Sequence, residues 1–188
     1  MKTRIRLLTT AALWAVLFTM AGCTTWTRIE APGMNGPDNR YTLEVPTGWV
    51  HAAFVTDSII ISKDGPGLNL IEVTHRKNSQ AFAKTKAAIT DDLLIGEVAD
   101  YFLAEFKATA GTQVNHLSTE PATVSGLSGF KAHLEIISPN GLVFDTLAYC
   151  TRDDVYFYSL LYRAPRLYYY EKDLKQFEDL VASFKIRS

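Results

Sequence analysis

Cysteine and net charge are both scarce in this chain of 188 residues. It carries two cysteines, Cys23 and Cys150, and its 19 basic residues nearly balance 20 acidic ones. Proteins that bind the phosphate backbone of nucleic acids need concentrated positive charge, so we expect no nucleic acid among the partners. The hydrophobic content of 47% fits a globular domain with a core of its own.

The sequence also lacks the spaced motifs of common catalytic and metal sites. The four histidines, at positions 51, 75, 116 and 133, form no His-x-x-x-His pair, and no nucleophile elbow, phosphate loop or dinucleotide fingerprint occurs. Cys150 is placed on a predicted core face of a sheet, which favours a buried, unreactive thiol over a nucleophile. We therefore expect no enzymatic activity and no bound cofactor.

The apolar stretch near the N-terminus is too short for a transmembrane helix. Its 14 residues, 7–20, would span about 21 Å as a helix, less than the roughly 30 Å hydrocarbon core of a bilayer. Three basic residues precede it and small residues follow it. Residues 1–22 therefore have the three-part layout of an export signal.

The end of this segment, Met20-Ala21-Gly22-Cys23, resembles the lipobox of bacterial lipoproteins. The resemblance implies that Cys23 becomes the N-terminus, carries a thioether-linked diacylglycerol and an N-acyl chain such as palmitate, and anchors the protein in membrane lipid. Thr24 resembles a signal for the outer rather than the inner membrane, with the domain facing the periplasm. The alternative is an ordinary cleaved signal followed by a free cysteine.

Removal of residues 1–22 leaves 16 basic and 20 acidic residues and, with Cys23 lipidated, one thiol, so no internal disulfide is expected. Residues 23–40 are predicted to be a flexible lipidated tether, because prolines and glycines interrupt any periodic pattern. Trp26 in this segment either lies at the headgroup level or packs on the domain as a loop residue. Residues 41–188 are predicted to form a single domain.

Apolar periodicity predicts the elements of this domain. Two helices are expected, the first beginning at Thr90 and ending at Gly111 and the second over 167–183, each with one apolar face. The turn at 64–67 predicts a hairpin. Strands are predicted over 41–45, 58–63, 68–76, 114–118, 122–124, 130–137, 142–151 and 155–163.

The last three strands are predicted to form a meander with two different faces. A three-residue loop at 139–141 would pair position 136 with 144, and a two-residue loop at 153–154 would pair 150 with 157. One face is then apolar and is predicted to be core. The other carries aromatic and polar side chains, and it is either solvated or partly covered by a helix.

On this second face, Glu135 is expected directly opposite Asp145, which is unfavourable unless a cation or hydrogen-bond donor lies between them. The expected donor is His133, Lys131 or the Tyr162 hydroxyl. An alternative is a divalent metal held by His133, Glu135 and Asp145, although the ligand spacing of a zinc site is absent.

Tyrosines are the candidate partner contacts, because exposed tyrosines supply contact area at low entropic cost. Ordinary packing in the sheet and helix is the alternative role. The candidates are Tyr149, Tyr158 and Tyr162 on the second face and Tyr168, Tyr169 and Tyr170 at the start of the second helix.

A series of short motifs in order resembles the PsbP-like superfamily, which includes photosystem extrinsic proteins, Mog-type import factors and DcrB-like envelope proteins. The motifs are Tyr41-Thr42-Leu43-Glu44-Val45-Pro46-Thr47-Gly48-Trp49, Asp64-Gly65, Pro121-Ala122-Thr123-Val124-Ser125-Gly126, Leu160-Leu161-Tyr162-Arg163-Ala164-Pro165 and Val181-Ala182-Ser183-Phe184-Lys185. The resemblance covers about residues 40–188. It implies an α+β fold with helices packed on the faces of a central antiparallel sheet, a PsbP-like α/β/α sandwich, and an accessory or binding role without catalysis.

The anchor and the resemblance together predict a lipid-anchored cell-envelope accessory protein that associates with or stabilises an envelope protein complex. The expected partners are membrane lipid, through the acylated N-terminus, and an envelope protein. The alternative is a small-ligand or metal-binding envelope lipoprotein, and an enzyme is the third hypothesis.

Overall fold

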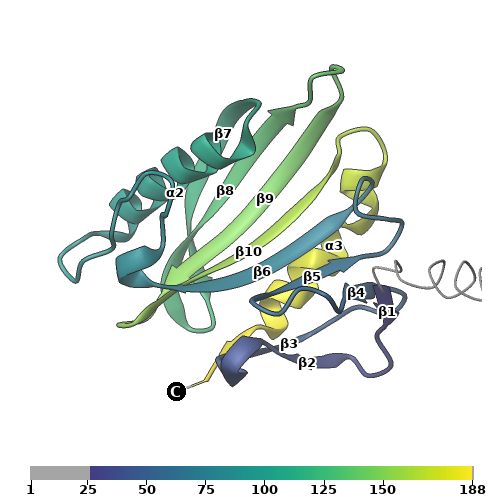
Figure 1. The fold of residues 1–188 in the computed structure, drawn as a ribbon, viewed down its shortest axis with the longest axis horizontal. Coiled ribbons are helices and arrows are strands. Elements are labelled where there is room, and N and C mark those ends of the chain that lie inside the picture. Colours follow the sequence, from purple (N-terminus) through teal and green to yellow (C-terminus); the bar gives the residue numbers. More distant parts are fainter. Residues whose placement is uncertain (1–25, 188) are drawn as a thin grey trace, which may run out of the picture.

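An antiparallel sheet of eight strands, with one helix on each face, forms the centre of the computed structural model, which describes residues 26–187 (Figure 1). Cys23 and the predicted signal segment lie outside the described residues. The elements in chain order are β1 (Trp26–Arg28), β2 (Gly33–Asn35), β3 (Tyr41–Glu44), β4 (Val50–Ala52), β5 (Ser58–Ser62), β6 (Leu70–Lys77), α2 (Ile95–Ala110), β7 (Gln113–Val124), β8 (Leu127–Ile137), β9 (Val143–Arg152), β10 (Tyr156–Pro165), α3 (Tyr169–Ser183) and β11 (Lys185–Ile186).

The large sheet has the order β1-β4-β5-β6-β10-β9-β8-β7, and a small sheet has the order β11-β3-β2. Short 3-10 helices follow β2 and β6, at Pro37–Asn39 and Asn78–Gln80. None of the helices within residues 26–187 is long and apolar enough to cross a membrane. The prediction of an α+β fold around a central antiparallel sheet is confirmed.

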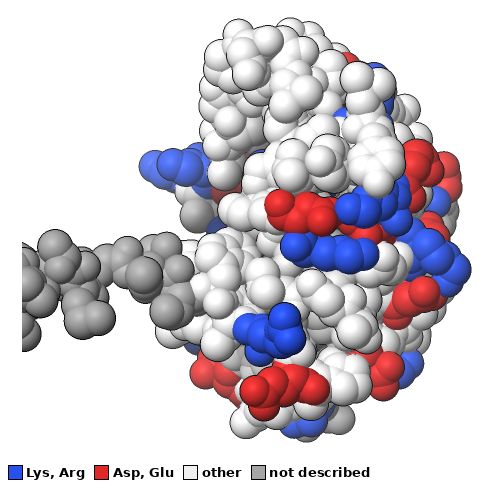
Figure 2. All heavy atoms as spheres, turned by 90° about the vertical axis from the view of Figure 1, so that its right-hand side faces the viewer, with Lys and Arg blue, Asp and Glu red and all other residues white. Residues whose placement is uncertain are grey.

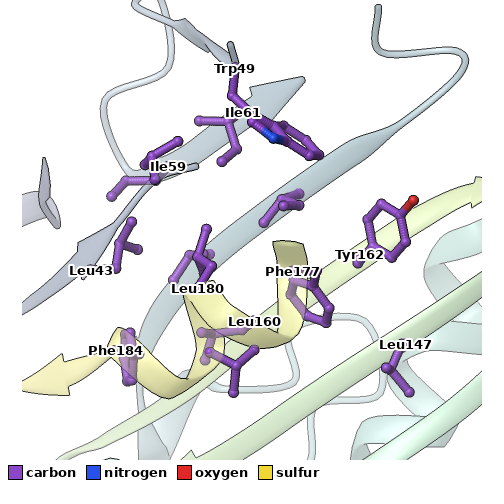
Figure 3. Packing of buried hydrophobic residues seen from close by; sticks show 14 of the residues in the cluster. Leu43, Trp49, Ile59, Ile61, Leu147, Leu160, Tyr162, Phe177, Leu180 and Phe184 are labelled. Carbon is purple, nitrogen blue, oxygen red and sulfur yellow. The ribbon is translucent and has the colours of Figure 1, made fainter. Parts of the chain in front are cut away.

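Side chains alternate between the two faces of the large sheet, and each face buries its own hydrophobic cluster. Helix α2 packs on β7 and β8, with Phe102 against Phe130 and Phe157; this side of the sheet is the α2 face. Helix α3 packs on the opposite side, the α3 face, where Phe177 and Leu180 meet Leu147, Leu160 and Tyr162 (Figure 3). The predicted aromatic and polar face of the meander is therefore the larger of the two cores.

A buried carboxylate fixes α3 to the hairpin between β5 and β6. Asp173 is fully buried, and it accepts hydrogen bonds from Lys63 Nζ, Asn69 Nδ2 and Gln176 Nε2, each at 2.9 Å. Gln176 in turn accepts a hydrogen bond of 2.9 Å from the indole N–H of Trp49. A buried charge is tolerated only when it is paired in this way, so the network determines where α3 lies on the sheet.

The predicted tether is corrected by the structure. Strand β1 pairs with β4 at one edge of the large sheet, and β2 pairs with β3 in the small sheet, so residues 26–40 belong to the domain. The glycines and prolines of this segment form tight turns between short strands. At Gly36, a Cβ atom would lie 2.3 Å from the Tyr41 ring, so the glycine permits a close approach of backbone and ring.

The register of the last hairpin is also corrected. Position 136 does lie opposite 144, as predicted, but Cys150 lies opposite Ser159 rather than Phe157. The loop is longer than expected because the Asp153 carboxylate accepts hydrogen bonds from the backbone N–H groups of residues 155 and 156. The shift is two residues, so every side chain keeps its predicted face.

Two element boundaries differ from prediction as well. Helix α2 begins at Ile95, not Thr90, because the Glu97 carboxylate caps the N–H of Leu94, while residues 90–93 form a separate turn. The two short strands predicted over 114–124 are a single strand, β7, with a bulge between His116 and Ser118. Pro121 is accommodated because β7 is an edge strand of the sheet.

We predict that Gly129→Ala destabilises the domain by about 1–3 kcal/mol, the range for overpacking a tight site. A Cβ at Gly129 would lie 2.1 Å from the carbonyl oxygen of Cys150 on the paired strand. Urea denaturation measures the change. Gly33→Ala is the matched control, because a Cβ there meets no atom within 4 Å, and its effect should stay within about 0.5 kcal/mol. Equal effects of the two substitutions would contradict the prediction.

Candidate functional site

The residues proposed as metal ligands meet at the end of the α3 face where α3 begins. Glu135 and Asp145 are directly opposite each other on β8 and β9, as predicted. Arg166, in the loop before α3, lies between them. Its Nε and Nη2 atoms donate to the two Asp145 oxygens at 2.7 and 2.8 Å, and its Nη1 lies 2.6 Å from Glu135 Oε2. His133 Nε2 also lies 3.1 Å from Asp145 Oδ1.

Arg166 is thus the principal cation between the two carboxylates, and His133 is the one predicted donor that also contacts Asp145. Burial raises the pKa of Asp145. The hydrogen bonds from Arg166, the positive charge of Arg166 and the contact with His133 lower this pKa by more, so the net shift is downward. The guanidinium occupies the position between the carboxylates that a bridging metal would need. No group of three or more metal-ligating side chains is found within residues 26–187.

Most of the candidate tyrosines serve packing. Tyr158 and Tyr162 are fully buried, which corrects the prediction that they contact a partner. The Tyr162 hydroxyl donates to the carbonyl groups of Tyr169 and Tyr170 at 2.8 and 3.1 Å, and Tyr170 itself is buried against Tyr162 and His133. Tyr149 is half-buried against Phe177. Tyr162 and Tyr170 thus hold the start of α3 on the sheet, whereas Tyr158 packs against Phe184 at the end of α3.

The turn before α3 exposes two apolar side chains, Leu167 at 80% and Tyr168 at 69%, which we call the 167–168 tip. Tyr168 has φ +71° and ψ −55°, and the N–H of Tyr169 donates to the Leu167 carbonyl at 2.9 Å. This is a classic γ-turn, a rare and strained conformation. Lys172 Nζ lies 5.6 Å from the ring centres of both Tyr168 and Tyr169. The tip is therefore an exposed apolar surface beside a cation.

Charges of both signs lie side by side at this end of the molecule (Figure 2). Figure 2 shows Lys and Arg side by side with Asp and Glu across the middle of this face, with a largely uncharged surface above them. This face has no single-sign patch of the kind that binds nucleic acid.

A groove lies on the α2 face, beyond the strands that α2 covers. It consists of two adjoining cavities of about 570 Å³ and 290 Å³, which share Glu72, Phe106, Thr109 and Leu161 in their walls. We call it the α2 groove. Its floor is formed by β6 and β10, and one wall is the C-terminal half of α2.

The α2 groove is apolar beside α2 and polar along β6. Phe106 and Leu161 border both cavities. On the side of the groove formed by the strands, Glu72 borders both cavities, Arg163 the larger one and Arg76 the smaller one. Burial raises the pKa of Glu72, although the charges of Arg163 and Arg76 oppose this shift. The sequence interpretation missed the groove because it assigned this whole face to the core. The alternation of Leu70, Glu72, Thr74 and Arg76 along β6 is the signal that points to it.

The free cysteine of the described residues is not a site. Cys150 is fully buried on the α2 face, and burial raises the pKa of its thiol well above the ordinary value. A nucleophilic cysteine needs the opposite shift and access to solvent.

Comparison with known proteins finds similarity in structure only. No protein-family model and no curated protein sequence matches the chain. The cyanobacterial PsbP protein CyanoP of Synechocystis has a TM-score of 0.60 at 12% identity, over 89% of this chain and 99% of that one. The Ran-binding protein Mog1p of Saccharomyces cerevisiae has a TM-score of 0.58 at 11% identity, over 84% and 96%.

Two further structures bear on the comparison. LpqN of Mycobacterium tuberculosis, a protein involved in cell envelope biogenesis, has a TM-score of 0.53 at 17% identity, over 87% of this chain and 90% of that one. A Bacteroides thetaiotaomicron protein matches with a TM-score of 0.56 at 10% identity, and this chain spans only half of its length. At these identities the likeness shows the fold alone. It confirms the predicted similarity in fold to PsbP and Mog-type proteins.

We predict that Arg166→Gln lowers the melting temperature and that the loss depends on pH. The folded-state pKa of Asp145 is lowered, so its stabilising contribution is present above the unfolded pKa of about 3.9 and is lost as the pH falls through the folded pKa. The gap between wild type and variant, measured by circular dichroism, should be wide at pH 7 and narrow towards pH 3.

The double variant Arg166→Gln/Glu135→Gln is the control, because it also removes the opposing carboxylate and should recover part of the melting temperature at pH 7. A gap of the same size at both pH values would show that Arg166 does not act through these carboxylates.

Proposed function

We propose that this protein is a lipid-anchored accessory protein of the cell envelope, which binds or stabilises an envelope protein complex and catalyses no reaction. The observation that carries this proposal is that β1, the first strand of the residues that the structure describes, begins only three residues after Cys23 in the sequence. The resemblance of Met20-Ala21-Gly22-Cys23 to a lipobox supplies the anchor, and Thr24 favours the outer membrane, with the domain facing the periplasm. The envelope role of LpqN and the Ran binding of Mog1p, two proteins with this fold, agree with a binding role.

A lipid on Cys23 would hold the domain against the bilayer. Three extended residues span at most about 11 Å, so the domain has little freedom to move away from the membrane. Trp26 packs edge-on against Phe54, which is 53% exposed, with ring centres 6.2 Å apart. Aromatic side chains favour the headgroup region, so this pair supports contact between the β1 edge and the membrane surface.

The 167–168 tip is the proposed contact with the protein partner. Of the candidate tyrosines, Tyr168 is exposed and Tyr169 is half-buried next to it. The strained γ-turn presents the apolar pair without further loss of conformational freedom on binding, a feature that favours protein contacts.

A second candidate function is small-ligand binding in the α2 groove. Its volume falls in the range of about 300–1,000 Å³ that is usual for ligand sites, and apolar and polar side chains converge there.

We predict that Cys23→Ser abolishes lipidation and membrane fractionation while the domain still folds. Incorporation of labelled palmitate and separation of membranes from soluble protein measure the first two effects, and circular dichroism measures the third. Cys150→Ser is the control, because a buried thiol takes no part in anchoring and this variant should keep its label. A labelled Cys23→Ser protein, or an unlabelled wild type, would refute the anchor.

We predict that the double variant Leu167→Ala/Tyr168→Gly weakens capture of the envelope partner by about 30-fold, the effect of losing a contact worth about 2 kcal/mol. Its melting temperature should not fall, because glycine adopts the positive φ of position 168 without strain. Crosslinking in intact cells followed by mass spectrometry measures the capture.

The control variant, Leu142→Ala/Val155→Ala, removes two apolar side chains of moderate exposure elsewhere on the surface. Capture should remain unchanged in this control. Equal losses in both variants would place the contact elsewhere.

A further inference from the structure

We infer that the α2 groove binds a single-chain amphiphile with an anionic head, such as a fatty acid, with the head at Arg163 and the chain along Phe106 and Leu161. The inference rests on the second candidate function, ligand binding, and does not depend on lipidation of Cys23. It follows from three features of the groove: an unpaired cation, an apolar wall and a single-ligand volume.

The first feature is the cation. Three basic side chains near the start of α3 form ion pairs, in contrast to Arg163. Arg166 pairs with Glu135 and Asp145, Lys63 with Asp173, and Lys172 with Asp64. Arg163 lines the larger cavity of the groove and is half-buried, yet within residues 26–187 it forms no ion pair and no side-chain hydrogen bond. A half-buried guanidinium without a partner favours an anionic group in the cavity beside it.

The only acidic side chain in the wall of this larger cavity is Glu72, on the neighbouring strand. It lies near Arg163 and Arg76, but no oxygen of Glu72 comes within 4.0 Å of either guanidinium, since no such ion pair occurs among the described residues. One negative charge therefore stands between two positive ones. Asp57 and Glu105 add negative charge at the Arg76 end of the groove. The Arg163 end, in the larger cavity, is therefore the end that favours an anionic head over a cationic one.

The second feature is the apolar wall opposite these charges. Phe106 of α2 and Leu161 of β10 border both cavities and are only partly buried. Leu70, Ile136 and Phe144 continue the apolar surface in the larger cavity, and Phe82, Phe102 and Phe157 continue it in the smaller one. The wall follows α2 from residue 102 to residue 111, about 14 Å at the rise of a helix. A linear chain lying along α2 would cover this surface.

The third feature is size. The two cavities join at shared residues and together have the volume of a single ligand site, in which polar groups at one side set the orientation of a mostly apolar molecule. An amphiphile with one chain matches this arrangement, because its head meets Arg163 while its chain removes the aromatic wall from water.

Calorimetric titration with dodecanoate, below its micelle concentration, tests the inference. The chain used lacks residues 1–22 and carries Cys23→Ser; it retains every residue of both hydrophobic clusters, which lie within the described domain. We expect saturable binding of one dodecanoate per chain. Affinity should rise about fourfold per methylene from octanoate to dodecanoate, the gain for burying each additional methylene.

Variants of the groove give effects of opposite sign. Arg163→Gln should weaken dodecanoate binding by about tenfold or more, as expected for the loss of a charge-assisted contact. Glu72→Gln should strengthen binding, because it removes the one negative charge beside the head. The control is Arg28→Gln, which changes an exposed arginine on β1 and should leave the affinity unchanged. Dodecyltrimethylammonium should bind more weakly than dodecanoate to the wild-type protein.

Absence of dodecanoate binding by the wild type would overturn the inference, as would an affinity that Arg163→Gln leaves unchanged. Binding that does not depend on chain length would identify an ordinary anion site and would also overturn it. If the wild type binds no dodecanoate and Leu161→Gln instead abolishes capture of the envelope partner, the groove is a protein interface. Palmitate labelling of Cys23 is unaffected by any of these results, so the anchor and the groove are tested separately.

Discussion

The fully buried carboxylate of Asp173 is the constraint on which the arrangement of this domain depends. Three donors from the β5–β6 hairpin and from α3 itself are needed to keep the charge in the interior, and they can meet only when α3 lies across the sheet in one position. That position places Phe177 over Tyr162, draws Arg166 between two carboxylates and leaves the turn at Tyr168 in a strained conformation. One buried carboxylate near the start of α3 thus ties the helix to the sheet.

Local sequence patterns were sufficient for the presence of the two helices and for the strands and two faces of the meander, because each depends on periodicity within one segment. Pairing between distant segments was not predictable in this way. Strand β1 is only three residues long, and its strand conformation depends on pairing with β4. The composition of the surrounding segment, which is rich in glycine and proline, is that of a linker, so local patterns do not reveal the strand. The register of the last hairpin differs from the predicted register by two residues. The Asp153 side chain, rather than turn propensity, determines the length of its loop.

In the candidate sites, too, local patterns predict some features and long-range contacts determine the others. The opposed pair of Glu135 and Asp145 followed from strand register, but its partner Arg166 comes from an irregular loop whose path has no periodicity. Strand register places Tyr158 and Tyr162 on the second face but does not reveal whether a helix covers it; helix α3 does, and both rings are buried in the packing role that was the alternative to partner contact. The groove could not be predicted because the length of α2 does not reveal which strands the helix covers; α2 leaves β6 and part of β10 uncovered.

Strand β7, with twelve residues, is the last strand of the large sheet within residues 26–187, so one of its edges has no partner strand there. A free edge of this length would ordinarily act as a template for the strands of neighbouring molecules. The bulge between His116 and Ser118 bends this edge, and Pro121 removes one of its donors. These two features make the edge a poor template for the strands of neighbouring molecules, so the exposed length of β7 does not by itself favour aggregation.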